Sequence, residues 1–416
     1  MKTEKQALVP RLRFPEFRDA GEWDFRELDD ACEVNPSNST LPKSFVYIDL
    51  ESVEAGQLIK KKNISREGAP SRAQRILKNG DVIFQIVRPY QKNNLFFEFD
   101  NDENYVASTG YAQLRAFGSE GFLYQVIHTD DFVARVLSKC TGSNYPAINS
   151  SDLAKVHLAI PVPDEQQKIA DFLSSLDALI AAQADKIDAL KTHKKGLMQQ
   201  LFPREGETVP RLRFPGFLEA GEWVDQELEN MAIRGSGHTP NKKYPSYYNG
   251  GIKWVSLADS DKLDKGYLYK TKNEISKEGL QNSSAVLHPA ETVVLSRDAG
   301  VGKSAVLHTP MAVSQHFIAW RCDNAKLNNW FFYYLLQRLK PELESIAVGN
   351  TIKTIGLFYF KSMVIAAPSV SEQKNIADCL SSLDSLIAAQ ADKLEALKAH
   401  KKGLMQQLFP SPEDLS

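Results

Sequence analysis

The sequence has few cysteines and no long apolar run. Its four cysteines lie far apart and form no Cys-x-x-Cys pair, which argues against a structural zinc site or a disulfide framework and suits a reducing compartment; they are Cys32, Cys140, Cys322 and Cys379. No apolar stretch approaches the roughly 20 residues that span a bilayer. Residues 1–6 lead into no hydrophobic signal region. We therefore expect a cytoplasmic protein.

An excess of charge of either sign is also missing. With 50 basic and 52 acidic residues, the net charge of −2 excludes a polycation but leaves room for a local basic face. The hydrophobic fraction of 43% and the charged fraction of 25% are those of folded proteins, so extensive disorder is not expected. A chain of 416 residues is long enough for two or more domains.

Catalytic motifs are incomplete wherever one begins. Gly300-Val301-Gly302-Lys303-Ser304 resembles a phosphate loop, but the glycine that such a loop needs five positions before Gly302 is Arg297. Asn35-Pro36-Ser37-Asn38 lacks the second proline and the aromatic residue of an amino-methyltransferase. Glu372-Gln373-Lys374 opens a helical segment without the strand-borne acidic partner of a nuclease, and the eight histidines form no His-x-x-x-His pair. We expect no active site and no bound metal.

The dominant feature is an internal duplication. Residues 9–17 return as 209–217, and each copy is followed by Ala-Gly-Glu-Trp. Residues 165–203 return as 372–410 with 32 of 39 positions identical. The regions between, 24–160 and 224–367, differ. A period near 200 residues indicates tandem duplication of a whole unit, for which we expect pseudo-two-fold symmetry.

The near-identical segments carry the heptad spacing of a coiled coil. We expect Asp164 and Ser371 as N-caps, and Pro203 and Pro410 as helix stops, which gives two rods of about 55 Å. The rods would pair antiparallel and bring the chain termini together in a nearly cyclic arrangement; the alternative is that each apolar stripe packs on its own globular domain. The seam positions are Leu173, Leu176, Ile180, Gln183, Ile187, Leu190, Lys194 and Leu197, matched by Leu380, Leu383, Ile387, Gln390, Leu394, Leu397, Lys401 and Leu404.

The variable regions are predominantly strand and turn in pattern. Short helices are expected near 121–139 and 327–346, so each region is predicted to be an α+β domain of roughly 140 residues. The expected strands are 81–87, 45–49, 94–99 and 105–115 in the first region, and 291–296, 252–257, 304–308 and 312–321 in the second.

Several loops of the variable regions combine amides, hydroxyls, basic groups and aromatic rings. Such residues suit DNA, since lysine and arginine neutralise phosphates while amides and arginine pair with base edges. Most polar loops are merely solvated, so composition alone is a weak signal. The candidates are Arg88, Tyr90, Gln91, Lys92, Asn93, Thr109, Tyr111, Ser143, Asn144 and Tyr145, and then His238, Thr239, Lys242, Lys243, Tyr244, Arg297, Lys303, Ser314, Gln315, His316, Asn350 and Lys353.

Three motifs occur in both halves of the chain: Pro10-Arg11-Leu12-Arg13-Phe14 with Trp23, Glu165-Gln166 with Ile169-Ala170, and the ending His193-Lys194-Lys195 to Pro203. With these motifs and their second copies, the whole chain resembles the specificity subunits of type I restriction–modification systems. His238-Thr239-Pro240 and Gly250-Gly251-Ile252-Lys253-Trp254-Val255 are similar to a target-recognition motif. The first variable region lacks that motif and resembles a different recognition subfamily.

The resemblance implies a fold, a function and partners. Two target-recognition domains, 1–160 and 204–367, would each read half of an asymmetric bipartite DNA target, and the spacer helices, 161–203 and 368–416, would set the separation and dock two methyltransferase subunits. Half-sites one duplex turn apart, some 34–36 Å, would let both domains enter major grooves on one face. S-adenosylmethionine, ATP and Mg would be bound by partner subunits, which include two restriction subunits, and no cofactor by this chain. The alternative is a non-catalytic adaptor whose duplicated domains bind proteins or glycans.

Overall fold

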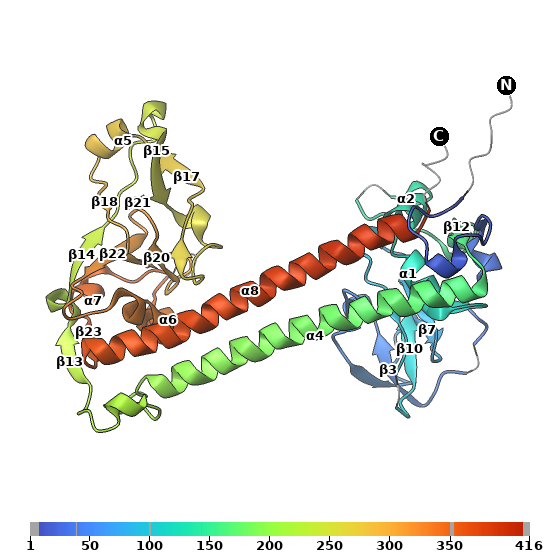
Figure 1. Ribbon diagram of the computed structural model, residues 1–416, viewed down its shortest axis with the longest axis horizontal. Coiled ribbons are helices and arrows are strands. Elements are labelled where there is room, and N and C mark those ends of the chain that lie inside the picture. The colour runs from blue at the N-terminus through green and yellow to red at the C-terminus, as the bar shows by residue number, and fades with distance from the viewer. Residues whose placement is uncertain (1–7, 39, 100, 143, 350–352, 411–416) are drawn as a thin grey trace. The chain divides into compact units, whose positions relative to one another are not determined.

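The computed structural model describes residues 8–410 except residues 39, 100, 143 and 350–352. Its contacts divide the chain into two compact units, of which residues 1–183 and 393–416 form the first and residues 184–392 the second. Each unit holds one variable region and part of both long helices. Of the four consecutive segments expected from the sequence, each variable region lies within one unit, and each long helix contributes one end to either unit (Figure 1).

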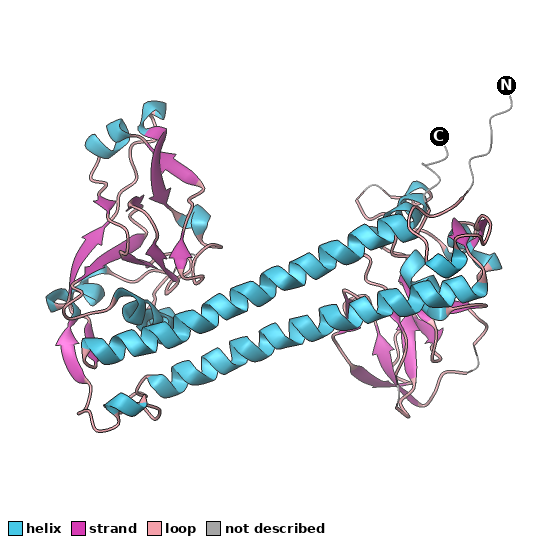
Figure 2. Ribbon diagram, viewed as in Figure 1, coloured by secondary structure: helices cyan, strands magenta, loops and turns pink. Residues whose placement is uncertain are grey.

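The variable region of the first unit contains two four-stranded sheets, with orders β6-β3-β10-β7 and β2-β11-β8-β9 (Figure 2). Short helices α1, α2 and α3 follow the strands, so the region is an α+β domain as predicted. The elements are β2 Cys32–Val34, β3 Ser44–Ile48, β4 Val53–Glu54, β5 Gln57–Leu58, β6 Lys62–Ser65, β7 Ala73–Ile76, β8 Val82–Gln85, β9 Leu95–Phe96, β10 Tyr105–Ser108, β11 Tyr111–Ala116, α1 Glu120–Val126, α2 Asp130–Ser138 and α3 Ser150–Ala154.

The variable region of the second unit contains a five-stranded and a four-stranded sheet, with orders β14-β22-β19-β20-β16 and β17-β15-β21-β18. Its largest helix, α6, packs its aromatic face into the main apolar core of this unit. The elements are β14 Ala232–Ser236, β15 Tyr248–Val255, β16 Tyr267–Leu268, β17 Asn273–Ile275, α5 Lys277–Gln281, β18 Leu287–His288, β19 Val293–Ser296, β20 Ser304–Leu307, β21 Met311–Val313, β22 Phe317–Cys322, α6 Asn329–Ile346 and α7 Leu357–Lys361.

Three predicted elements are each broken in two. The strand expected at 105–115 is β10 followed by β11, and the strand expected at 312–321 is β21 followed by β22. In both cases the break carries the chain from one sheet to the other, which no local pattern announces. The helix expected at 121–139 is α1 followed by α2, because the Thr129 side chain accepts from Phe132 N and starts a new helix.

The near-identical segments form the long helices α4, Pro163–Leu201, and α8, Val370–Leu408. Each has 39 residues and is therefore about 58 Å long. Both end two residues before the predicted stops. The predicted N-caps are wrong, since Asp164 and Ser371 lie inside the helices, and it is the Ser369 hydroxyl that accepts from Glu372 N at 3.4 Å.

Within each unit the start of one long helix packs against the end of the other. In the first unit, Lys401 Nζ donates to both carboxylate oxygens of Asp177 at 2.7 Å, and Gln125 Nε2 of α1 donates to Asp177 at 2.9 Å. In the second unit, Asp384 accepts from Lys194 and, at 2.8 Å, from the Tyr334 hydroxyl of α6. The two aspartates occupy equivalent positions of the duplicated segment, so one arrangement is built twice.

The packing confirms the predicted antiparallel pairing of the helices within each unit. Every predicted seam position is buried or partly buried, and the two lysines of the seam form the ion pairs to Asp177 and Asp384. Stripes that packed only on their own domains would not produce these pairs. The fold class expected from the sequence is therefore confirmed.

The duplicated Arg-Leu-Arg-Phe-Pro segment clamps the start of each long helix. Arg13 donates through Nε and Nη2 to Glu165 at 2.8 and 2.7 Å, and Arg213 donates in the same way to Glu372 at 2.8 Å. Both pairs are almost fully buried. A bidentate geometry is what makes a buried ion pair favourable, because both oxygens of the carboxylate are satisfied.

Each clamp segment also contacts the end of the other helix. Leu12 N donates to Gln407 O at 2.9 Å, and Leu212 N donates to Gln200 O at 3.0 Å. In the first unit the Trp23 ring meets Phe409 edge-on, with centroids 6.1 Å apart. The described residues nearest the two chain ends are therefore neighbours, as the nearly cyclic arrangement requires.

A two-stranded ribbon closes each domain before the long helix that follows it. β1, Asp24–Glu27, pairs antiparallel with β12, His157–Ile160, and β13, Val224–Glu227, pairs in the same way with β23, Val364–Ala367. Each ribbon joins the first and last residues of a variable region. The first and last residues of each variable region therefore lie next to each other.

Candidate nucleic-acid interface

Several chain segments leave the four-stranded sheet of the second unit at one edge. β15 and β21 are parallel neighbours, so the residues after Val255 and Val313 emerge side by side, and Ser314 N donates to Val255 O at 2.8 Å. A Cβ on Gly237 would lie 2.0 Å from Val313 O, which explains the glycine before His238. This edge gathers the His-Thr-Pro segment and the Ser-Gln-His segment predicted from the sequence.

A chain of hydrogen bonds links four predicted segments at this edge. His316 Nδ1 donates to Asp298 at 2.8 Å, and Thr354 Oγ1 donates to the other carboxylate oxygen. Because Nδ1 donates, a neutral His316 presents Nε2 as an acceptor, and Gln315 Nε2 lies 3.4 Å away. The Thr239 hydroxyl donates to Gln315 Oε1. The exposed amide of Gln315 is therefore held in one orientation, as readout of a base edge requires.

The segment that resembles a phosphate loop is a turn between two strands. Gly300 and Gly302 have φ of +108° and +83°, and the next element is strand β20 rather than the helix that a phosphate loop opens. Lys303 Nζ donates to Ser260 O at 3.1 Å. Ala299 N donates to Lys353 O at 3.3 Å, so the turn brings Lys353 to the same edge. The Arg297 side chain, one-fifth exposed, lies 3.5 Å from Asp298.

Other predicted residues of the second unit lie elsewhere. Lys242, Lys243 and Tyr244 continue towards the 3-10 turn η6, Pro245–Tyr247, which contacts α5 and the opposite end of β15. Ser314 is a correction, because it is 1% exposed and its side chain faces the core. Asn350 lies outside the described residues.

In the first unit, two predicted loops meet at the end of β8. Val87 forms a bridge with Ala147, and Arg88 N donates to Pro146 O at 2.7 Å. The Arg88 guanidinium lies 4.3 Å from the centroid of the Tyr145 ring. Arg88 has a left-handed backbone with φ of +54°, a conformation that non-glycine residues adopt mainly where function or packing demands it. Tyr145 is 64% exposed, so the pair presents a ring and a cation to solvent.

The remaining candidates of the first unit differ in whether their side chains are exposed. Tyr90, Gln91 and Asn144 are exposed beside this pair, Asn93 accepts from Ala55 N at 3.4 Å, and Thr109 lies at the break between β10 and β11. Tyr111 is a correction, because its ring is fully buried and its hydroxyl donates to Asp49 O at 3.3 Å. Ser143 lies outside the described residues.

Lys92 is a further candidate of the first unit, and its ammonium already has partners within that unit. Its Nζ donates to His128 O at 2.8 Å and to Asp130 at 2.7 Å. His128 Nδ1 donates to Tyr124 O at 2.6 Å, and Asn94 Nδ2 donates to His128 Nε2 at 3.2 Å. Burial, which the hydrogen bond to Tyr124 O and the charge of Asp177 oppose and the charges of Lys401 and Lys92 reinforce, lowers the pKa of His128 from 6.5 to about 4. The imidazole is therefore neutral at pH 7.

The depressed pKa predicts a loss of stability in mild acid. The unfolded chain binds a proton at His128 near pH 6.5 and the folded chain only near pH 4. The contribution of the neutral His128 to the stability of the fold is thus complete above pH 6.5 and is lost as the pH falls towards 4. Between pH 7 and pH 5 the free energy of unfolding should fall by about 1–2 kcal/mol more in the native chain than in His128→Gln. Urea denaturation measures this, with His193→Gln, an exposed helix position, as control; equal losses in His128→Gln and the native chain would contradict it.

The two candidate edges are built at equivalent positions. Thr141 bridges Ala147 in the first unit, and Val348 bridges Thr354 in the second, which are the same positions of the duplicated unit. In each unit a second bridge joins this loop to the segment that follows a strand: Ala147 pairs with Val87 after β8, and Thr354 pairs with Asp298 after β19. The sequence gives little signal of this equivalence, because the two loops share no more than a glycine. One framework therefore presents two different sets of side chains.

The described residues contain no cluster of three or more histidine, cysteine, aspartate or glutamate side chains that could hold a metal ion. Within the same part of the chain, none of the helices is both long and apolar enough to cross a membrane.

Comparisons with known proteins place the chain among duplicated proteins of this architecture. The model of the type I restriction modification DNA specificity domain matches residues 20–192 and again residues 220–399, and the chain belongs to that family. The two matches correspond to the two copies of the duplication, each with its variable region and following helix.

Curated relatives are distant. A protein of Methanocaldococcus jannaschii provisionally named the type I restriction enzyme MjaX specificity subunit is 26% identical over 271 residues, which cover 64% of this chain and 61% of the relative. The MjaVIII specificity subunit of the same organism is 24% identical over 285 residues and 65% of either chain. The chain thus spans less than two-thirds of the length of these relatives.

A solved structure shares the fold. A chain described under complex assembly and conformational transition of the type I restriction–modification system has a TM-score of 0.60 and 23% identity, covering 93% of this chain and 97% of its own length. At that identity the likeness supports the fold alone.

Proposed function

We propose that this chain is the DNA specificity subunit of a type I restriction–modification enzyme. Each variable domain reads one half of a split double-stranded target, and because the two domains differ, the target is asymmetric. The observation that carries the proposal is the pair of equivalent sheet edges, which have one framework and different polar side chains. Arg88 with Tyr145 in the first unit, and Gln315 with Lys353 in the second, are side chains that suit bases and phosphates.

The near-identical parts of the chain serve partners that are identical to each other. Two methyltransferase subunits dock on the duplicated helices and clamp segments, since surfaces with the same residues bind the same protein. These subunits carry S-adenosylmethionine and methylate adenine N6. Two restriction subunits complete the ATP- and Mg-dependent nuclease. The helix pair sets the spacer between the half-sites, so deletion of one heptad from both helices changes the spacer and leaves the half-sites unchanged.

Reconstitution tests this division of labour. The purified chain is incubated with S-adenosylmethionine and host DNA, either alone or with the methyltransferase encoded beside it. We expect no methylation by the chain alone or by the methyltransferase alone, and methylation of one split motif by the mixture. Methylation by the isolated chain would contradict the proposal, and so would the same modified motif without the chain.

A further inference from the structure

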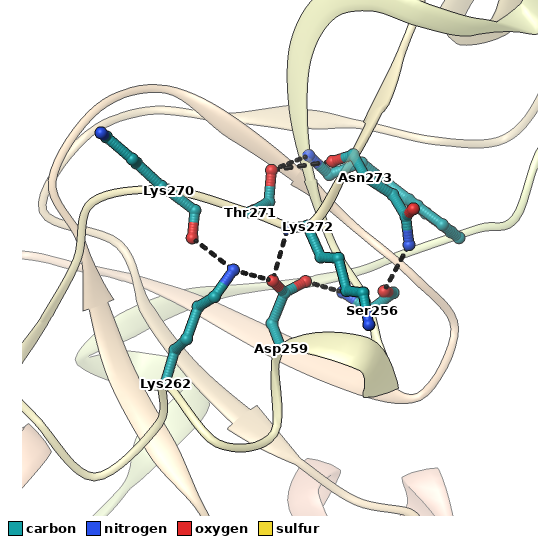
Figure 3. A network of polar contacts seen from close by, with 8 residues as sticks. Ser256, Asp259, Lys262, Lys270, Thr271, Lys272 and Asn273 are labelled. Carbon is teal, nitrogen blue, oxygen red and sulfur yellow. Dashed lines mark hydrogen bonds and ion pairs between the residues drawn. The ribbon is translucent and has the colours of Figure 1, made fainter. Parts of the chain in front are cut away.

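The loop between β15 and β17 in the second unit is organised around one buried carboxylate. Asp259, at the end of the 3-10 turn η7, Leu257–Asp259, is fully buried. It accepts from Ser256 N at 3.2 Å, from Lys262 Nζ at 2.8 Å and from Lys272 N at 2.7 Å (Figure 3). One charge therefore holds the beginning, the middle and the end of the loop, and it is itself balanced by Lys262.

Further hydrogen bonds fix the last residues of the loop. Lys262 Nζ also donates to Lys270 O at 3.3 Å. Trp254 N donates to the Thr271 hydroxyl at 3.2 Å, and that hydroxyl donates to Asn273 O at 2.8 Å. The chain is thus held at Lys270 O, at the Thr271 side chain and at Lys272 N, and in Figure 3 the Lys270 side chain extends away from the network.

The two lysines lie on the edge that carries the candidate interface. β17 pairs with β15 with Trp254 opposite Asn273, so Lys272 lies at the end of β15 from which Ser256 leaves. β21 lies on the other side of β15, and Ser314 to His316 follow it. Lys272 and the Ser-Gln-His segment are therefore separated by two strand spacings, about 10 Å. The hydrogen bond from Lys303 Nζ to Ser260 also joins this loop to the turn between β19 and β20, which carries Asp298.

The charges at this edge distinguish these lysines from their neighbours. Lys262 is neutralised by Asp259, and Arg297 lies beside Asp298. Lys270 and Lys272 are exposed, and neither ammonium forms an ion pair with any residue that the structure describes. An unpaired ammonium group on a fixed backbone at the rim of a DNA-reading edge has the chemistry of a phosphate contact, because duplex DNA carries one charge per roughly 1.7 Å of its axis.

We infer that Lys270 and Lys272 bind the phosphate backbone of the duplex that the second domain reads. The inference rests on the proposed function and adds a surface to it. The lysines neutralise phosphates and carry no sequence information, so they determine how the second domain is seated on the duplex. The base-reading groups at the edge then lie in the groove beside that backbone.

The test measures how binding depends on salt. The full chain, in complex with its methyltransferase partner, is titrated with a target duplex and with an unrelated duplex of the same length. Loss of two phosphate contacts should lower the slope of log affinity against log salt by about 1.8 in the double variant Lys270→Gln/Lys272→Gln. The loss of DNA affinity in this double variant, relative to the native complex, should be about tenfold larger at 50 mM than at 200 mM salt. It should be the same for both duplexes.

A matched double variant separates contact from net charge. Lys277→Gln/Lys361→Gln removes two exposed lysines, one in α5 beyond the opposite end of β17 and one at the end of α7. Its slope should equal that of the native complex. The inference is overturned if Lys270→Gln/Lys272→Gln keeps the native slope, if the matched variant loses as much, or if only the target duplex is affected. Absence of any target preference in the native complex would instead overturn the proposed function, so the two failures are distinguishable.

Discussion

Arg213→Met should destabilise the second unit by about 3–5 kcal/mol, the effect of leaving a buried carboxylate without its partner. Arg213 and Glu372 are 6% and 2% exposed, and the arginine satisfies both oxygens of the carboxylate. Methionine keeps much of the side-chain volume but supplies no donor. Urea denaturation of the full chain measures the loss in the transition of the second unit.

Two further variants identify the cause of that loss. Arg211→Met removes an exposed ion pair with Glu207, at 3.3 Å, and should change stability by less than about 0.5 kcal/mol. Glu372→Gln added to Arg213→Met removes the stranded charge and should recover part of the stability. Equal effects of Arg213→Met and Arg211→Met would show that the clamp does not hold the helix.

Exchange of residues 24–160 for the corresponding region of another family member should replace one half of the modified DNA motif completely and leave the other half unchanged. The boundaries follow from the structure, because Asp24 pairs with Ile160 at the end of the β1–β12 ribbon. The exchanged region therefore carries its ribbon with it. The clamp between Arg13 and Glu165 lies outside the exchange and is retained.

Sequencing that detects N6-methyladenine measures the outcome of the exchange. The reciprocal exchange of residues 224–367, bounded by the pairing of Val224 with Ala367, serves as the matched control and should replace only the other half. If either exchange altered both halves, the domains would not read the target independently.

The elements that local patterns specify were predictable from the sequence. The heptad spacing and the duplication predicted both long helices, and the seam lysines were included although they are charged. Their acidic partners, Asp177 and Asp384, could not be inferred, because an aspartate outside the seam resembles any solvated helix residue. The predicted N-caps are wrong because the helices begin earlier, at Pro163 and Val370, so that Asp164 and Ser371 lie in their first turns.

Burial and pairing determine which of the predicted interface residues remain available at the surface. Tyr111 and Lys92 have the composition of a binding loop, yet one is a core ring and the other is engaged by His128 and Asp130. Lys270 and Lys272 are not among the predicted residues, because their backbone is held by the buried Asp259, and the burial of Asp259 is set by the surrounding sheet. Which polar side chains remain free depends on contacts between segments far apart in the chain.

The methylome of the host, with and without this gene, tests the central claim most directly. A subunit that gives a methyltransferase its target should, when deleted, abolish N6-methyladenine at every occurrence of one asymmetric split motif and leave other modified motifs unchanged. Restoring the gene should restore that motif. Persistence of every modified motif in the deletion strain, with the neighbouring methyltransferase still expressed, would contradict the account.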